Sequence, residues 1–281
     1  MVCLLDESAC SVYEQFVEEQ VDDSFYYSLL WRDVLVHGNC GQPRYLLALQ
    51  GDHVRGVLPL FEAHISDGCR ALVSLPATPA AGTLSDDVSA RWLLASRALA
   101  LAQLNGFAGV LVRTFCPSAA SDVPHGQPDW LRIPIATLLA LPVRPDTAAH
   151  PHSVAVHPAD ADDSAPDASG APDWIDYRLP RWRQSRYAPL RVVARDDAGR
   201  TAATAICLLD GRSAHVLTYR CSCTSCEGLL PLLQQIGRLA AERGAARLDF
   251  PAPPSQPSLA ALYAVAEVSR LSPLTIGNTA R

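Results

Sequence analysis

Three stretches of the chain carry apolar residues at helical spacing between residues that commonly cap helices. They cover residues 24–38, 86–106 and 227–244. Ser24 is a candidate N-cap for the first stretch and Gly38 its C-cap, while Asp86 and Asp87 open the second. Polar N-caps followed by apolar residues three and four positions apart, with glycine at the end, predict three α-helices.

Between these helices, short apolar runs alternate with turn residues. "RYLLALQGDHVRGVLPLF" holds two runs around Gln50 to His53, and "TAATAICLLDGRSAHVLTYR" holds two runs around an Asp-Gly pair. Each pattern predicts a β-hairpin. "RALVSLP", "GVLVRTF" and "AARLDF" predict single strands. The order hairpin, helix, strand occurs in both halves, which indicates a weak internal duplication and a mixed α/β fold, α+β with mixed sheets.

Composition divides the chain. Residues 142–173 are rich in Pro, Ala, Asp and Ser and contain almost no large apolar side chains, so this segment cannot bury enough surface to order itself. We therefore expect an N-terminal domain over 1–140, a low-complexity linker over 141–173 and a C-terminal domain over 174–281.

The overall composition excludes several classes of protein. With 281 residues, 49% of them hydrophobic, the chain can fold as one large or two small domains. A formal net charge of −6 argues against a surface built as a whole for nucleic acid. The sequence has no lysine, which excludes a Schiff base, a lysine nucleophile and a P-loop.

Cysteine usage and the N-terminus bear on location. The chain has nine cysteines, an odd number, and "MVCLLDESAC" carries acids where a signal peptide needs basic residues. We expect a reducing, cytoplasmic compartment. The apolar run "WLLASRALALAQL" is interrupted by Arg97 and is periodic like a buried helix, so no membrane span is expected.

One strongly basic segment stands out in this acidic chain. Residues 178–195, "RLPRWRQSRYAPLRVVAR", hold six arginines and no acid. Arg181, Arg183 and Arg186 could pair with phosphates while Trp182 and Tyr187 stack on bases. Alternatively, the arginines form a solvated face or pair with the acids of the linker. Only a phosphate role predicts strong dependence on salt.

A cysteine cluster follows the second hairpin. "CSCTSCEG" places Cys221, Cys223 and Cys226 in a C-x-C-x-x-C pattern, with Cys207 or His215 as a possible fourth zinc ligand. A second paired cysteine motif is missing. A reactive thiol and simple packing of small apolar side chains remain alternatives, and packing is favoured.

The order of elements resembles that of the Fem-like peptidyltransferases, a branch of the acetyltransferase superfamily with two tandem GNAT-type domains. "WRDVL", "YLLALQGDHVRGVLPLF" and "LVSLP" carry most of the resemblance, with "DGR" and "ERGAARLDF" in the second half. The resemblance implies two tandem GNAT-like domains and transfer of an aminoacyl group from aminoacyl-tRNA to an amine. It also places the basic segment between the two halves.

Acyl transfer to an amine needs a base, stabilisation of the oxyanion and protonation of the leaving group. Residues at expected strand ends supply candidates: Glu227 or Asp249 as base, and Tyr219 or Arg220 for the oxyanion. Each could instead be a helix cap, an ion-pair partner or a core residue, and the sequence shows no Ser-His-Asp or Cys-His arrangement.

Three further residues are candidates for binding substrate. Arg113 lies at an expected strand end, and Tyr26 and Trp31 lie on the first predicted helix, where they could line a groove. For the two aromatic residues a place in the core is the favoured alternative.

The leading hypothesis is therefore a cytoplasmic acyltransferase that forms an amide, with aminoacyl-tRNA as a possible donor, a small-molecule or peptide amine as acceptor and no cofactor. Acetyl-CoA or another acyl-CoA is the alternative donor. Neither "LPATPAAGTLSDD" nor "YRCSCTSCEGLL" shows the glycine-rich loop that usually binds its pyrophosphate. A non-catalytic binding or scaffold protein that retains the fold is a third hypothesis.

Overall fold

The computed structural model describes residues 1–20, 25–66, 68–117, 130–141, 153–158, 187, 189–196, 198–221, 228–252 and 260–274. The chain divides into two compact units, one formed by residues 1–114 with 270–281 and the other by residues 115–269. Among the described residues, no helix is both long and apolar enough to cross a membrane.

The first unit contains strands that form two groups. β1, β3 and β4 pair in the order β1-β3-β4, and β2, β5, β6 and β7 pair in chain order. The strands are β1 (Val2–Leu4), β2 (Gln42–Pro43), β3 (Leu46–Gln50), β4 (His53–Leu58), β5 (Leu60–Ser66), β6 (Cys69–Ser74) and β7 (Val110–Pro117). All these pairs are antiparallel except β6 with β7, which is parallel.

The helices of this unit are α1 (Cys10–Gln20), α2 (Leu29–His37) and α3 (Val88–Leu104). α3 buries Ala90, Leu94, Ala98 and Ala102 against apolar residues of β3 to β7. Gly56 of β4 leaves room for this packing, because a Cβ there would lie 2.8 Å from Ser85 Cβ and 3.1 Å from Leu94 Cδ1.

Removal of the Asp87 cap is expected to destabilise α3. The Asp87 carboxylate accepts hydrogen bonds from the N–H groups of Ser89 and Ala90 at 2.7 and 3.2 Å. Asp87→Ala should lower the free energy of unfolding by about 1 kcal/mol, measured by urea denaturation. Asp86→Ala, at the exposed neighbour, is the control and should change it by less than about 0.5 kcal/mol. Equal losses in the two variants would contradict the cap.

The second unit is a sheet with helices on one face. Its strands follow the order β8-β13-β12-β11-β10-β9, with the first residues of β14 paired to β8, and only β12 with β13 is parallel among the pairs described in it. They are β8 (Trp130–Pro134), β9 (Ser153–Pro158), β10 (Leu190–Arg195), β11 (Thr201–Asp210), β12 (Ser213–Cys221), β13 (Arg247–Pro251) and β14 (Glu267–Pro273). The helices are α4 (Ile135–Ala140), α6 (Leu229–Glu242) and α7 (Ala260–Val265).

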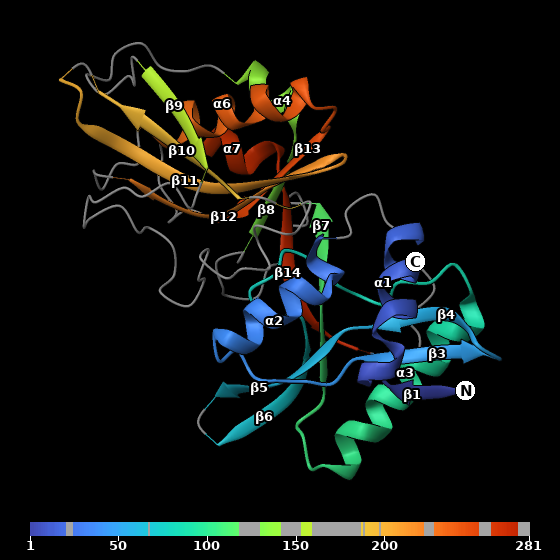
Figure 1. The fold of residues 1–281 in the computed structure, drawn as a ribbon. Helices are drawn as coiled ribbons and strands as arrows, with labels where there is room; N and C mark the ends of the chain where they lie inside the picture. The colour runs from blue at the N-terminus through green and yellow to red at the C-terminus, as the bar shows by residue number, and fades with distance from the viewer. Residues whose placement is uncertain are drawn as a thin grey trace. The chain divides into compact units, whose positions relative to one another are not determined.

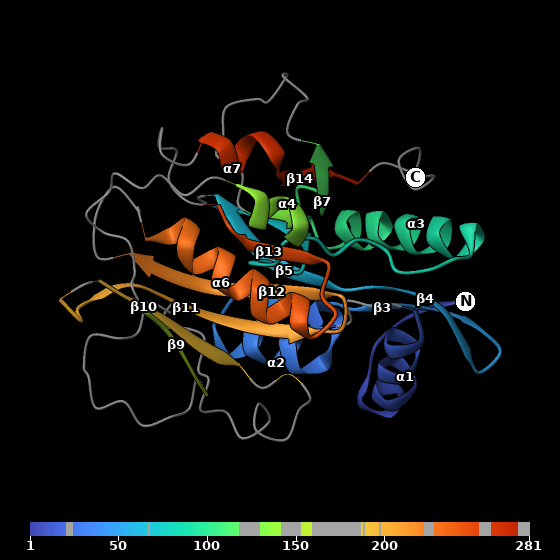
Figure 2. The same ribbon diagram turned by 90° about the horizontal axis from the view of Figure 1, so that it is seen from above.

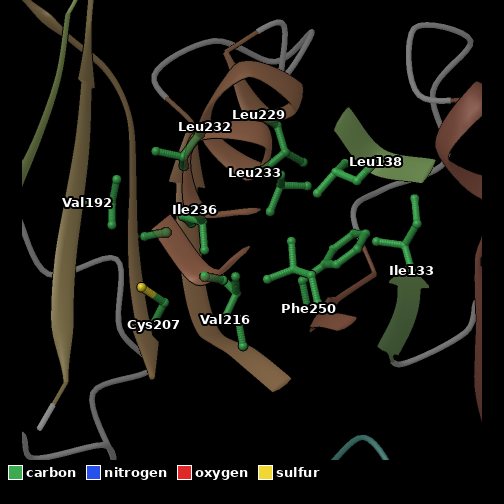
Figure 3. Close-up of a cluster of buried hydrophobic side chains, with 14 of the residues drawn as sticks. Ile133, Leu138, Val192, Cys207, Val216, Leu229, Leu232, Leu233, Ile236 and Phe250 are labelled. Carbon is green, nitrogen blue, oxygen red and sulfur yellow. The ribbon is translucent and has the colours of Figure 1, made fainter. Parts of the chain in front are cut away.

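The core of the second unit lies between α6 and the sheet. Figure 3 shows Val192, Cys207 and Val216 from the strands facing Leu232, Leu233 and Ile236 of α6, all of them buried. α4 closes one side of this core, and Figures 1 and 2 show it beside α6. Gln234 of α6 donates hydrogen bonds to the carbonyls of Leu138 and Leu141 at 3.1 and 2.9 Å, which ties the two helices together.

Several expected elements are confirmed and several differ. α3, α6, both predicted hairpins and the strands β6, β7 and β13 lie where the sequence placed them. The first predicted helix begins later than expected: Phe25–Tyr27 form a 3₁₀ turn and Ser28 is the N-cap of α2, its Oγ accepting from Trp31 N–H. Ser24 lies outside the described residues.

The expected domain limits and the observed units also differ. β8 and α4 precede residue 141 but pack in the core of the second unit, so that unit begins before the expected linker. Within the expected linker, Ser153–Pro158 forms β9 and pairs with β10.

Candidate functional site

The most informative feature of the second unit is its parallel pair, β12 with β13. The two strands pair only at Ser213 with Arg247, Ala214 with Leu248 and His215 with Asp249, among the residues described. β12 continues to Cys221, whereas β13 ends at Pro251 and pairs with β8 along its whole length. Where the ladder between two parallel strands ends, backbone N–H and C=O groups can bind a ligand in place of a neighbouring strand. We call the region beyond His215, where β12 no longer pairs with β13, the β12–β13 gap.

A β-bulge lies at the start of this gap. Cys207 of β11 pairs with Val216, but the next residue, Ile206, pairs with Thr218, so Leu217 is an extra residue in β12. Bulges redirect backbone groups and side chains and are frequent beside active sites. The bulge therefore gives β12 an irregular backbone at the point where β13 leaves it.

A buried charged row borders the same point. Arg132 of β8 donates from Nε to Asp249 Oδ1 at 2.6 Å and from Nη2 to Asp249 Oδ2 at 2.7 Å. His215 Nδ1 lies 3.3 Å from Asp249 Oδ2. The Asp249 and His215 side chains are fully buried, whereas Arg132 keeps 19% of its side-chain exposure.

Two opposing effects act on the Asp249 carboxyl. Burial alone raises its pKa, but the hydrogen bonds and charge of Arg132, together with His215, outweigh burial and hold the pKa below the usual value of an aspartate. Asp249 is therefore ionised at neutral pH, with both oxygens engaged. This arrangement favours an ion-pair role for Asp249 over the role of general base.

The row also brings a serine near a His–Asp pair. Ser213 precedes His215 by two positions, on the same face of β12, and is fully buried. Its Oγ has no hydrogen-bond partner among the described residues, so it does not donate to His215. Ser213, His215 and Asp249 therefore do not form a Ser-His-Asp triad.

The structure separates the predicted catalytic residues. Tyr219 and Arg220 lie on β12 beyond the divergence, beside the gap, with Arg220 exposed and Tyr219 packed against the core on the opposite face. Asp249, expected at a strand end beside the cleft, is instead in the middle of β13 and buried, because it pairs across to β8 and β12. Glu227 lies outside the described residues.

The first unit has a corresponding parallel pair, β6 with β7, but its divergence is filled. After Val73 pairs with Leu111, the N–H of Arg113 donates to Ser74 Oγ at 2.9 Å instead of to a strand carbonyl. Ala81 N–H donates to the Arg113 carbonyl at 3.3 Å, so the loop after β6 occupies this place. The Arg113 side chain is also buried.

The aromatic residues of the first unit hold this loop. Trp31 Nε1 donates to Thr78 Oγ1 at 3.0 Å, and both residues are buried. Tyr26 is 3% exposed and packs edge-on to Trp31, with 5.4 Å between the ring centroids. These positions favour the core alternative for Tyr26 and Trp31 over a substrate groove.

The two long helices that connect the strands of the parallel pairs, α3 between β6 and β7 and α6 between β12 and β13, begin differently. Asp87 places a carboxylate on the first N–H groups of α3, which disfavours an anion there. α6 begins after Gly228, which has no side chain to bond those groups, and its first turn carries no acid. Of the two helix starts, that of α6 fits the phosphates of an acyl donor better.

The zinc hypothesis gains no support from the described residues, which contain no cluster of three or more potential metal ligands. Cys207 points into the core beneath α6, and burial raises the pKa of its thiol to about 12. His215 lies on the opposite face of the sheet, between the core residues Ala214 and Val216, so Cys207 and His215 cannot share an ion. Cys221 is half-buried, and Cys223 and Cys226 lie outside the described residues.

Most of the basic segment is not described. Arg181, Trp182, Arg183 and Arg186 lie outside the described residues. Tyr187 is described and is only 7% exposed, so its ring is packed in the protein and not presented for stacking on a base.

Comparison with known proteins yields the fold. No protein-family model and no curated protein matches the sequence. Among solved structures, FemX aligns with 98% of this chain and 96% of its own, at 12% identity and a TM-score of 0.54.

Two further solved structures resemble the chain. The C-terminal domain of a putative lysylphosphatidylglycerol synthetase from Agrobacterium fabrum aligns over 97% of this chain and 93% of its own, at 11% identity and a TM-score of 0.50. A tandem GNAT protein from the clavulanic acid biosynthesis pathway covers 98% of both chains at 13% identity, with a TM-score of 0.47. The likeness to FemX and to the synthetase domain shows that the chain shares their mixed α/β fold.

Proposed function

We propose that the protein is an acyltransferase of the GNAT type that binds its acyl donor in the β12–β13 gap of the second unit. The observation that carries this proposal is the parallel pair that separates immediately after His215, with a bulge at Leu217. There the backbone of β12 can bind the acyl chain and polarise its carbonyl. The corresponding place in the first unit, which the loop after β6 occupies, suits a structural role better.

The reaction would form an amide. The acceptor amine attacks the carbonyl carbon and loses a proton, and the thiolate or alkoxide that leaves takes up a proton. Arg220, exposed on β12 beside the gap, and Tyr219 remain candidates to stabilise the oxyanion. Because Asp249 is held in an ion pair, we assign the base to Glu227 in preference to Asp249.

For the donor, we favour aminoacyl-tRNA, as the Fem-like resemblance of the sequence implies, with a small-molecule or peptide amine as acceptor. The basic segment around Arg181, Arg183 and Arg186 would bind the phosphates of the tRNA. An acyl-CoA is the second candidate, since Gly228 and the first turn of α6, as far as the structure describes this helix start, hold no carboxylate and would accept a pyrophosphate.

The donor is tested by binding. Filter binding of pooled, labelled aminoacyl-tRNA at low and moderate salt should show saturable, salt-sensitive binding that is lost when Arg181, Arg183 and Arg186 are changed to Ala. Calorimetry with acetyl-CoA forms the parallel arm. Binding of acetyl-CoA alone would replace aminoacyl-tRNA as the donor, and binding of neither would refute the proposed function and favour a non-catalytic binding protein.

A charge at the start of α6 tests the site itself. Gly228→Asp should weaken binding of an anionic donor by about tenfold, because a carboxylate at the N-cap accepts hydrogen bonds from the first N–H groups of α6 and repels the donor's phosphates. The helix should still form, since a Cβ at residue 228 meets its nearest neighbour at 3.5 Å, an ordinary contact. Gly228→Ala is the matched control, with unchanged affinity. Equal affinities of the Asp and Ala variants would exclude the start of α6 as the phosphate site.

A further inference from the structure

The charged row lies at the apex of the β12–β13 gap and extends over four strands. His215 and Asp249 form the last pair before β12 and β13 separate, Asp249 lies opposite Arg132 of β8, and Arg132 lies opposite Glu267 of β14. Exposure falls along the row from Glu267, which is exposed, to Asp249 and His215, which are fully buried. Leu208 of β11 ends the row beside His215.

A buried row of charged residues contributes little to the free energy of unfolding compared with apolar residues at the same positions. Charges lose their hydration on burial, and well-packed apolar residues of similar volume are often as stable or more stable. A bidentate ion pair is, however, a strict geometric constraint. The planar guanidinium of Arg132 meets both oxygens of Asp249, at 2.6 and 2.7 Å, and only one alignment of β8 with β13 allows both hydrogen bonds.

Because His215 of β12 contacts Asp249, the ion pair that fixes the alignment of β8 with β13 also fixes the position of β12 at His215. His215 precedes the bulge at Leu217 by only two residues, and the ladder between β12 and β13 ends at His215. Movement of His215 along or away from β13 would therefore shift the bulge and change the opening of the gap.

We propose that Arg132, Asp249 and His215 are positioning residues that fix where β12 leaves β13 and thereby place the bulged backbone against the carbonyl of the acyl donor. The catalytic part of this inference rests on the proposed function, whereas the structural part, control of the β12 backbone by the row, does not.

The experiment replaces the charges without breaking the packing. Arg132→Met combined with Asp249→Leu removes both charges together, and Asp249→Asn keeps the shape of the side chain but removes its charge. Asp196→Asn is the matched control. Asp196 also forms an ion pair with an arginine, Arg200, at 2.8 Å, but in an exposed turn.

Three readouts are taken on each full-length variant: thermal unfolding, amide hydrogen exchange of residues 213–221, and kcat and KM with whichever of acetyl-CoA and the aminoacyl-tRNA pool the wild type uses. The double variant, Arg132→Met with Asp249→Leu (the Met/Leu variant), should keep its Tm or raise it. Its amide hydrogens at Val216 to Tyr219 should exchange about tenfold faster. Its kcat should fall roughly 100-fold, since small misplacements of catalytic groups are costly. Its donor KM should change little, and Asp196→Asn should match the wild type throughout.

The outcomes separate the two proposals. Wild-type exchange and kcat in a folded Met/Leu variant would overturn the positioning role. If the wild type uses neither donor, the proposed function is refuted. Faster exchange at Val216 to Tyr219 in the Met/Leu variant would then still support control of the β12 backbone by the row. If the Met/Leu variant does not fold, the same three readouts are taken on Asp249→Asn. A fall in its kcat that is larger than the fall in its fraction of folded protein would support the positioning role, and an equal fall would overturn it.

Discussion

Replacing Asp249 by alanine is expected to lower the free energy of unfolding by about 3 kcal/mol at neutral pH. The change leaves the Arg132 guanidinium without the carboxylate that now accepts both of its hydrogen bonds. Removal of one partner from a buried ion pair typically costs about 3–5 kcal/mol. The lower end applies because Arg132 retains 19% of its side-chain exposure and can regain some hydration. Urea denaturation at pH 7 measures the loss.

The pH dependence of this loss follows from the direction of the pKa shift. The pKa of folded Asp249 lies below that of an unfolded aspartate, about 3.9. The ion pair therefore contributes its full stability above about pH 4 and loses it as the pH falls through the lower, folded pKa. The difference between wild type and Asp249→Ala should shrink below about pH 4, as denaturation at about pH 3 would show.

Asp196→Ala is the control for this prediction, because it removes a carboxylate from an exposed ion pair with Arg200. It should cost about 1 kcal/mol or less. A similar loss in the Asp249 and Asp196 variants, or a difference that stays constant with pH, would contradict a stabilising buried ion pair.

The elements that the sequence predicted are those specified by local signals. Asp87 and the apolar spacing after it mark α3, and Asp210 with Gly211 marks the turn between β11 and β12, where Gly211 has a positive φ of 54°. Both signals act within a few residues. Local chemistry therefore identified α3 and this hairpin correctly.

The sequence correctly predicted the repeated order of hairpin, helix and strand, but it matched the wrong hairpin of the first half. The sequence matched the hairpin β3–β4 with β11–β12, whereas in the structure β5–β6 is the hairpin that precedes α3 and supplies the parallel partner of β7. β3 and β4 pair instead with β1. Strand partners depend on contacts far apart in the chain, and the apolar patterns of neighbouring hairpins are too similar to distinguish them.

The candidate site shows the same limit. Asp249 of "RLDF" was predicted to be a base because the sequence placed it at a strand end beside the cleft. Its partner Arg132 lies 117 residues earlier, and the register of β8 with β13 alone brings the two together. The sequence therefore identified the residue but not the ion pair that determines its chemistry. His215, considered only as a metal ligand, was missed for the same reason.

The first unit offers the second large effect. Trp31→Ala is expected to lower the free energy of unfolding by about 3–5 kcal/mol, the usual cost of removing a large buried aromatic ring. Trp31 is 1% exposed and packs against Phe25 and Tyr26, with ring centroids 5.2 and 5.4 Å away. It also donates to Thr78, so its loss removes the anchor of the loop that fills the β6–β7 divergence. Thermal and urea denaturation followed by circular dichroism measure the effect.

Two variants separate packing from hydrogen bonding. Trp31→Phe keeps much of the ring but removes the indole N–H, and should cost about 1–3 kcal/mol, because Thr78 is buried. Trp92→Ala makes the same chemical change as Trp31→Ala on the outer side of α3, where Trp92 is 49% exposed, and should change stability by less than about 0.5 kcal/mol. If Trp31→Ala lowered the free energy of unfolding as little as Trp92→Ala, Trp31 would not be a core residue, and a role in a substrate groove would be favoured. A large loss of unfolding free energy in Trp31→Ala with a small loss in Trp31→Phe would show that the ring acts mainly by packing. The loop after β6 would then be held by its other contacts, such as the hydrogen bond from Ala81 N–H to the Arg113 carbonyl.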